Sequence, residues 1–362
     1  MDKKTDKTLN NTIDINPIPY LTWTWLKINK DSVSYDFSFA ANDGIENTQA
    51  QNIKIQNGNP SDFPYMNDNS SIGKQARELI LQANPDGKTY IIEKGNIEDI
   101  SKPLFIRITA DKNSASYQKI FIKAGAQASV IIVFEGGSDT EPTLLGNLTE
   151  IYAEEDSKLH ISKIQLCGKA VNQLDDTAVI CKDRAKVSLT QIELGGAHID
   201  AGFHAALDGY QSSFYSDTAY ICQRNQYLDM NQVVVHKGKK TVCDMKTHGT
   251  AKDQAVKTYR GTIDMRKGCA GSQGNEIETT LLLSPKAVVK AAPIILCGEE
   301  DIAAEHGSTI GKLSNEMLFY MNSRGIDQKT AEALLTRAKI TAAASSIEDE
   351  GIQKEINRFL DE

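Results

Sequence analysis

Short strand-like units recur through the middle of the chain at intervals of about 26 to 29 residues. Each unit begins with a turn residue, continues with small or polar residues and ends in a run of alternating apolar and polar residues. The clearest four units span residues 156–162, 183–190, 209–216 and 238–244. One such unit cannot bury its own apolar face, so repeats of this length stack on one another as a solenoid. With no helices between the units, the repeat predicts the coils of a β-helix.

A jelly roll or β-sandwich is the competing fold. Those folds use fewer, longer strands joined by tight hairpins, for which Asn-Gly is a strong sequence signal. The chain has Asn-Gly only at residues 57–58, outside the repetitive region. The sequence therefore favours a mainly β protein with a β-helix core over residues 96–310.

The regions on either side of this core differ from it in sequence pattern. Residues 1–95 are mixed: residues 17–29 read as a short strand or an anchoring arm, and apolar residues recur at helical spacing over residues 72–83. Residues 311–362 are predicted to be helical. The residues leave open whether this tail caps the open end of the solenoid or docks into the groove of a partner.

Capping residues divide the C-terminal region into three predicted helices. Ser314 and Asp327 begin the first two, and Ser345 with Glu348 has capping-box spacing for the third. The apolar stripes expected on the second and third helices are Ala331, Leu334, Leu335 and Ala338, and Ile352, Ile356, Phe359 and Leu360.

Charge and apolar content exclude several classes of protein. The 362 residues carry 40 Lys and Arg against 48 Asp and Glu, a net charge of −8, which argues against binding to nucleic acid or to an anionic membrane surface. No run approaches the roughly 20 apolar residues of a membrane span. The first residues are charged with no apolar stretch behind them, so we expect no leader peptide and a cytoplasmic protein.

The motif search is mostly negative. The six cysteines have no C-x-x-C spacing and read mostly as small buried hydrophobes in a reducing compartment, with one or two left as candidate ligands. Nucleotide-binding loops, zinc-protease motifs and serine-hydrolase motifs are absent, so the chain shows no nucleotide pocket or nucleophile elbow of its own. The adjacent carboxylates at residues 175–176 and 299–301 make no obvious acid/base pair, because neighbours on a strand point to opposite faces. Both are interpreted as solvated turns.

Among the six histidines, no two have H-x-H or H-x-x-H spacing. His198 and His204 fall where they share one surface. His306 differs in its setting, because it stands at the junction between the β region and the helical tail. The two glycines and two hydroxyl residues around it, in residues 305–311, predict a tight and defined backbone.

The chain from Leu281 to Leu335 combines several short motifs. They are the strand LLLS, an aliphatic strand after a proline, His-Gly-x-Thr-x-Gly beginning at His306, then Leu-Phe-Tyr and Ser-Arg-Gly-Ile. Together they resemble the C-terminal signature of the SufB/SufD family of iron–sulfur cluster assembly proteins. Tyr259-Arg260-Gly261 also fits the family pattern, and the resemblance covers about residues 90–340.

Within that family, the chain resembles the D type more than the B type. Gly307 stands where the B type usually has a glutamate after the histidine. Glu278 and the neighbourhood of Ala205 stand where the B type has its sulfur-receiving cysteines. Ala304 replaces a cysteine that D-type members often carry, so no role of that cysteine is transferred to this chain.

The resemblance implies a right-handed parallel β-helix flanked by helical terminal regions. It implies that the chain pairs through its β-helix with a SufB-type paralogue or with itself, and binds a SufC-type ATPase through its C-terminal helical region. Such a subunit supports cluster assembly or iron acquisition and is not an enzyme by itself. A transient iron ion or iron–sulfur cluster at the subunit interface is then expected, and no tightly bound cofactor.

The same resemblance suggests which residues carry the function. His306 matches the D-type residue at the interface between the paired chains, where an imidazole offers iron a borderline-soft ligand. The candidate interface neighbours are Glu305, Glu278 and Cys297. The candidate partner-binding residues are Phe319, Tyr320, Arg324, Ile356, Phe359 and Leu360.

Two alternatives remain from the residues. One is a β-helical carbohydrate-active enzyme, a polysaccharide lyase or hydrolase, which needs carboxylates or an arginine along one groove. The other is a structural β-solenoid with no further activity.

Overall fold

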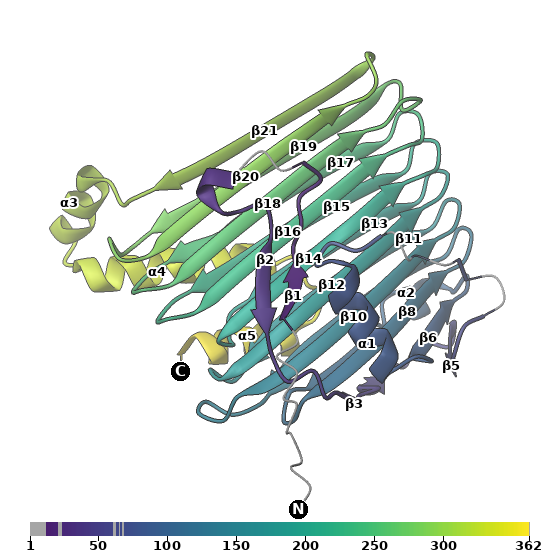
Figure 1. Cartoon of the computed structure of the whole chain (residues 1–362), viewed down its shortest axis with the longest axis horizontal. Coiled ribbons are helices and arrows are strands. Elements are labelled where there is room, and N and C mark those ends of the chain that lie inside the picture. Colours follow the sequence, from purple (N-terminus) through teal and green to yellow (C-terminus); the bar gives the residue numbers. More distant parts are fainter. Residues whose placement is uncertain (1–11, 21–23, 61–62, 65, 67–68, 362) are drawn as a thin grey trace, which may run out of the picture.

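The chain forms a parallel β-solenoid of about 8 turns (Figure 1). This computed structural model describes residues 12–20, 24–60, 63–64, 66 and 69–361. The mainly β fold predicted from the repeat is confirmed, with helices at the C-terminus. The expectation of no leader peptide rests on the first residues, which lie outside the described part of the chain.

Each full coil gives one strand to each of two sheets. The ten-stranded first sheet runs in the order β20 (Val288–Cys297), β18 (Val256–Met265), β16 (Tyr227–His236), β14 (His198–Leu207), β12 (Val171–Cys181), β10 (Thr143–Ala153), β8 (Ser114–Ile122), β6 (Lys88–Ile92) and β5 (Ile53–Asn57), with β3 (Ala40–Ala41) also paired to β8. The nine-stranded second sheet runs β21 (Ile302–Gly311), β19 (Ser272–Leu282), β17 (Val242–Ala251), β15 (Ser213–Cys222), β13 (Lys186–Glu193), β11 (Lys158–Cys167), β9 (Gln127–Gly136), β7 (Leu104–Thr109) and β4 (Ile45–Asn47). The ladders are parallel except β5 with β6 and β4 with β7.

The turn residues of the sequence repeat mark one corner of the coils. At this corner the chain passes from the first sheet to the second, and a residue with positive φ lies two positions before the strand begins. These residues are Gly125, Asp156, Arg184, Gln211 and Lys240. Their backbone amides bond to the next coil, as from Arg184 N to Tyr210 O at 2.8 Å. The repeat length is therefore the spacing between stacked corners.

The space enclosed between the two sheets, called the lumen, holds the main core. Alternate residues of each strand point into it, and toward the N-terminal end of the solenoid they are mostly Ile, Val, Leu and Phe. The outer faces of both sheets are also apolar in part. Parallel sheets generally need cover on both faces, and the two ends of the chain supply it.

The N-terminal layer, made of β1 (Thr12–Ile15), β2 (Asp31–Ser34) and α1 (Lys74–Ala83), lies on the outer face of the first sheet (Figure 1). The helix predicted over residues 72–83 is thus confirmed. The strand interpretation of residues 17–29 is wrong, because their described part is a connection containing the short helix η1 (Thr24–Leu26). The anchoring interpretation holds at Ile28, which is buried and accepts a hydrogen bond from Arg260 Nε at 2.6 Å.

The C-terminal helices α4 (Gln328–Ala344) and α5 (Glu350–Asp361) lie on the outer face of the second sheet (Figure 1). The expectation that the tail caps the open end is therefore wrong, because the apolar outer face of the sheet takes both helices. Another short helix, α2 (Ile97–Ile100), lies beside β9. The first helix of the tail, α3 (Asn315–Ser323), has no buried residue.

Two of the three predicted caps are confirmed: Ser314 and Asp327 accept hydrogen bonds from the amides of Met317 and Thr330. The third is wrong, since Ser345 ends α4 and Asp349 begins α5 by accepting from the Ile352 amide at 2.8 Å. The stripe on α4 is also partly wrong. Its buried residues are Ala331, Thr336, Ile340, Ala343 and Ala344, while Leu334 and Ala338 are exposed.

The turn interpretation of residues 175–176 is wrong, because both carboxylates are buried in the middle of β12. Asp175 points into the lumen, where Lys163 Nζ lies 2.6 Å from its Oδ1. Asp176 points outward and accepts from the amide of Ser71 at 2.9 Å. Residues 299–301 do form an exposed turn.

Among the helices of the described residues, none combines the length and the apolar character that a membrane-spanning helix requires.

Replacing Ile356 tests the packing of α5 on the sheet. Ile356 is 1% exposed in the cluster with Ile192 and Ala219, so Ile356→Ala should lower the free energy of unfolding by about 2–5 kcal/mol. Ile310→Ala, at a residue 46% exposed, is the control and should change it by less than about 0.5 kcal/mol. Urea unfolding of both variants provides the measurement, and equal small effects would contradict this packing.

Candidate functional site

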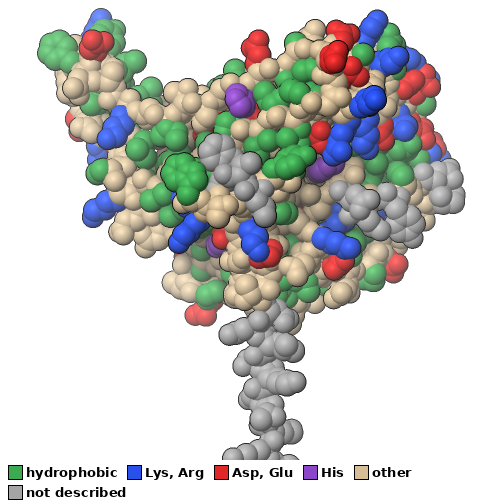
Figure 2. Space-filling model, turned by 45° about the horizontal axis from the view of Figure 1, so that its top comes forward, with side chains coloured by type: hydrophobic (Ala, Val, Ile, Leu, Met, Phe, Trp, Pro, Cys, Tyr) green, Lys and Arg blue, Asp and Glu red, His purple; other side chains and the backbone are tan. Residues whose placement is uncertain are grey.

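The C-terminal end of the solenoid is an uncovered coil made of β20 and β21. Each is the last strand of its sheet, so its outer edge has no ladder partner in the described chain. Pro293 lies in β20, and a sheet tolerates proline mainly on such an edge. Figure 2, in which this end comes forward, shows apolar side chains on its surface and on the projecting tip formed by α3. We call this coil the open end.

His306 lies in the middle of β21 and is exposed. Its register partner on β19 is Glu276, whose side chain is buried in the lumen. Register partners in a sheet point to the same face, so the imidazole faces the mouth of the lumen. It is exposed because no further coil covers it. His306 therefore marks the point where the interior of the solenoid meets its surface.

Glu278 lies one coil below this mouth and is fully buried. Lys257 Nζ approaches its Oε1 to 2.6 Å, and Ser308 Oγ on β21 donates to its Oε2 at 2.7 Å. Burial lowers the pKa of Lys257, and the adjacent carboxylate opposes that effect. The predicted neighbour of His306 is thus one half of a buried ion pair that also holds the last strand.

Glu276 lies directly beneath the imidazole in the ladder. Neither of its carboxylate oxygens has a hydrogen bond of good geometry, although the Tyr259 hydroxyl lies close by. Burial raises its pKa to about 8, an effect that the neighbouring Tyr259 hydroxyl opposes. The lumen below His306 therefore holds an acid that is largely protonated at neutral pH.

The Tyr259-Arg260-Gly261 motif supports both faces of this region. Tyr259 and Gly261 point into the lumen, and a side chain at Gly261 would collide with the Glu276 carboxylate. Arg260 points outward, pairs with Asp229 and donates to the Ile28 carbonyl. One motif thus makes room for the buried acid and anchors the N-terminal layer.

The other predicted neighbours do not gather around His306. Glu305 points to the opposite, outer face of β21 and is exposed, since successive residues of a strand alternate in direction. Cys297 is exposed at the end of β20, before the corner that leads into β21. Four residues of extended chain separate Ile302 from His306, about 13 Å. This chain therefore brings Glu276 and Glu278 to the mouth, and neither Glu305 nor Cys297.

Five of the six cysteines are buried, as predicted: Cys167, Cys181, Cys222, Cys243 and Cys269. Burial raises the thiol pKa of Cys222 and Cys243 to about 12. Such thiols remain protonated and unreactive at neutral pH. Cys297 is the exposed one.

The predicted partner-binding residues divide into two groups. Phe319, Tyr320 and Arg324 lie on or just after α3 and are exposed, with the guanidinium over the Tyr320 ring at 5.3 Å. Ile356 is buried against the second sheet, and Phe359 and Leu360 pack partly buried against the same cluster. The first group is exposed, whereas Phe359 and Leu360 remain only partly accessible and Ile356 is covered.

Sequence reasoning missed two polar features. A column of polar side chains follows the lumen, including hydrogen bonds from Asn147 to Asp175 at 2.8 Å and from Gln232 to Thr218 at 3.0 Å. The second is the group formed by Asp31, His198 and Asp200 on the outer face of the first sheet. The H-x-D spacing places His198 and Asp200 on one face of a strand, whereas Asp31 gives no signal because it lies far away in the sequence.

Comparison with known families identifies the family of the chain. The model described as "SUF system FeS cluster assembly, SufBD core domain" matches residues 106–339. The chain belongs to the SufB/SufD family. The resemblance seen in the C-terminal motifs is confirmed, and this SufBD match includes the open end and most of α4.

Curated relatives place this SufBD chain closer to the D type. It is 28% identical to the iron–sulfur cluster assembly protein SufD of Bacillus subtilis over 299 residues, 81% of this chain and 68% of that protein. It is 23% identical to SufD of Escherichia coli over 247 residues, 67% of this chain and 58% of the relative. With SufB of Bacillus subtilis the identity is 22% over 277 residues, 76% and 59% of the two chains. The matched chain thus spans about three fifths to two thirds of these relatives.

The raised pKa of Glu276 makes a testable prediction about stability. An acid whose folded-state pKa lies above its unfolded value of about 4.5 favours the folded state at low pH, and this contribution is lost as the pH rises toward 8. Glu276→Gln should match the wild type near pH 4.5 and exceed its free energy of unfolding by a few kcal/mol at pH 8.5, at about 1.4 kcal/mol per pKa unit.

Urea unfolding across this pH range measures the difference. Glu305→Gln, on the exposed outer face of the same end, is the control and should show no pH-dependent difference from the wild type. A Glu276→Gln difference that does not vary with pH would mean that this carboxylate is not held neutral.

Proposed function

We propose that this chain is a SufD-like scaffold subunit that pairs through its open end and binds an ATPase through α3. Membership of the SufB/SufD family supports a role in iron–sulfur cluster assembly. The pairing partner is a SufB-type chain or a second copy, and the ATPase is of the SufC type. The observation that carries the proposal is the uncovered coil with His306 at the mouth of the lumen.

The open end has the properties of a pairing surface. The outer edges of β20 and β21 offer unpaired backbone groups, which another strand can satisfy. Exposed apolar side chains lie on the last coils, among them Ile277, Val288 and Ile310. A second solenoid stacked on this coil would continue both sheets and cover the edges of β20 and β21 together with Ile310 at the mouth of the lumen, while Ile277 and Val288 flank it on the outer faces.

Pairing would also complete a site for iron. His306 offers one imidazole nitrogen, a ligand suited to iron, and it is not part of a three-ligand group within the described residues of this chain. Further ligands would come from the paired chain. A cluster assembled there would be cargo, held at the interface and released when the two chains separate or distort.

The helix α3 is suited to a separate partner. It follows the last strand directly, buries none of its residues and exposes Met317, Phe319 and Tyr320 together. A helix with an apolar face exposed in this way docks readily into a partner's groove. Because Ile356 is buried and Phe359 and Leu360 are only partly accessible, the proposed ATPase surface is centred on α3 and Arg324.

A glycoside hydrolase lacks a comparable basis in the described part of the chain. The groove of about 330 Å³ on the second sheet is lined by Lys158, Lys186 and His160, with Glu348 as its single carboxylate. Glycoside hydrolysis uses a pair of carboxylates. The groove therefore lacks the groups for that reaction.

Co-purification tests the two surfaces separately. The full chain, mixed with SufB-type and SufC-type proteins from the same genome, should retain both. Phe319→Glu should lose the ATPase and keep the paralogue, because it places a charge on the exposed face of α3. Trp25→Glu is the matched control, since both side chains are 77% exposed, and it should retain both partners.

His306→Ala tests the cluster site in the same reconstitution. The free energy of unfolding of the variant should lie within about 0.5 kcal/mol of the wild-type value, because the imidazole is exposed. The reconstituted complex should form less iron–sulfur cluster, as measured by visible absorption. Retention of neither partner by the folded wild-type chain would refute the scaffold assignment. Normal cluster formation by His306→Ala would refute the role of the imidazole alone.

A further inference from the structure

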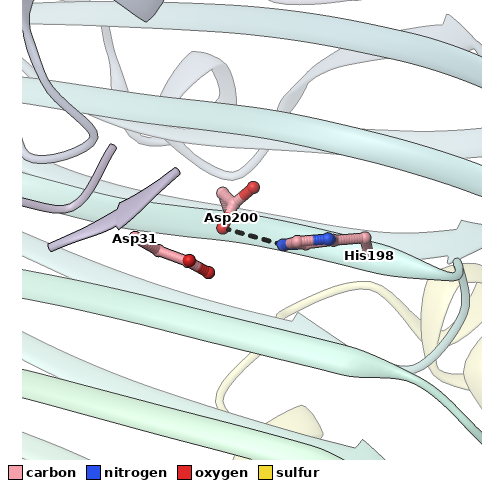
Figure 3. A group of neighbouring side chains, drawn as sticks. All are labelled: Asp31, His198 and Asp200. Carbon is pink, nitrogen blue, oxygen red and sulfur yellow. Dashed lines mark ion pairs between the residues drawn. The ribbon is translucent and has the colours of Figure 1, made fainter. Parts of the chain in front are cut away.

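The N-terminal layer and the first sheet together form a group of three potential ligands. His198 and Asp200 lie two residues apart on β14 and so point to the same outer face. Asp31, the first residue of β2, reaches the same place from the N-terminal layer (Figure 3). One ligand atom from each residue lies within 4.8 Å of the others.

The Asp200 carboxylate is the unusual member of this group. It is fully buried, and neither of its oxygens accepts a hydrogen bond. The His198 imidazole, which is positive only when protonated, is its neighbour, with Nε2 3.3 Å from Oδ1 (Figure 3). Buried carboxylates are otherwise paired, hydrogen-bonded or bound to metal, because desolvation of a lone charge is costly.

The fixed charges around Asp200 are mostly negative. Asp229, its register partner on β16, adds a second buried carboxylate beside it. Arg260 is the nearby fixed cation, and it is committed to Asp229 and the Ile28 carbonyl. With Asp31, the pocket holds three carboxylates against one arginine, so it favours a further positive charge.

The imidazole is held in place for such a role. The His198 ring lies 4.4 Å from the Tyr227 ring and 6.1 Å from the Tyr35 ring, measured between centroids. Its Nε2 accepts and donates no hydrogen bond. Two carboxylates and one imidazole are a ligand set used for zinc, manganese and other divalent first-row metals.

We propose that Asp31, His198 and Asp200 bind one divalent first-row metal ion between the N-terminal layer and the first sheet. The ion neutralises Asp200 and connects β2 to β14 directly. The site lies on the outer face of the solenoid, is separate from the open end, and does not rest on the proposed scaffold function. A proton on His198, pairing with Asp200, is the competing occupant.

Metal titration of the full chain tests the site. The chain is freed of metal with a chelator and titrated with Co²⁺ by visible absorption and with Zn²⁺ by calorimetry. The background carries Cys297→Ser and His306→Ala, which removes an exposed thiol and an exposed imidazole as other ligands. One ion per chain should bind, with a cobalt spectrum of nitrogen and oxygen ligands.

Three variants identify the ligands. His198→Gln, Asp200→Asn and Asp31→Asn should each weaken binding by about 100-fold or more, since loss of a supporting group alone costs about 10–100-fold. Asp31→Asn is decisive if Asp200→Asn fails to fold, because Asp31 is only half-buried.

His248→Gln is the matched control. His248 lies on β17 with Nε2 2.8 Å from Asp217 Oδ1, and its side chain is 22% exposed against 23% for His198. It belongs to no such three-ligand group in the described chain, so its loss should leave binding unchanged. No stoichiometric binding by the parent, or binding that survives both Asp31→Asn and Asp200→Asn, would overturn the proposal and leave the protonated ion pair.

Discussion

The parallel ladder between successive coils is the constraint on which the rest of this structure depends. Each strand satisfies its backbone groups only with the strands one coil before and one coil after. The coil length is therefore set by stacking, and each corner must return the chain in register. Left-handed residues such as Asp156 and Arg184 make those corners possible at a repeated position. A ladder of this kind also has to end, and its last coil keeps an unsatisfied edge.

The same ladder creates three apolar surfaces, namely the lumen and the outer faces of the two sheets, and a polar section of the lumen. Side chains of the coils fill the lumen, the N-terminal layer covers the first sheet, and the C-terminal helices cover the second. Toward the open end the lumen becomes polar, with Lys257 and Glu278 paired inside it. Removing one member of such a pair is costly because a charge stays buried without a partner. Glu276, the buried acid beneath His306, depends in turn on the family motif at residues 259–261, because a side chain at Gly261 would collide with its carboxylate.

Local signals made much of this fold predictable. The repeat predicted the solenoid because the corner residues recur with the coil, and Ser314 and Asp327 predicted helices because a cap acts within its own turn. The prediction that Ser345 caps the third helix failed because Asp349, four residues later, is the cap. The prediction that Leu334 is buried failed because contact with the sheet, rather than apolar spacing alone, decides which face of α4 is buried. The site divides in the same way: His306 stands in a recognisable motif, whereas the approach of Asp31 to His198 depends on the folded chain.

The N-terminal layer crosses several coils, and this affects how the solenoid loses structure. It bonds to Asp176 on β12, to Asp229 on β16 and to Arg260 on β18. An array stabilised only by neighbour contacts frays coil by coil from its ends. This layer is bonded to β12, β16 and β18, so the four coils from β12 to β18 melt together, and within the described chain none of its hydrogen bonds reaches β20 or β21. The outermost coil is then the least stable part of the solenoid. It can open locally and change its shape while the coils bound by the N-terminal layer stay rigid.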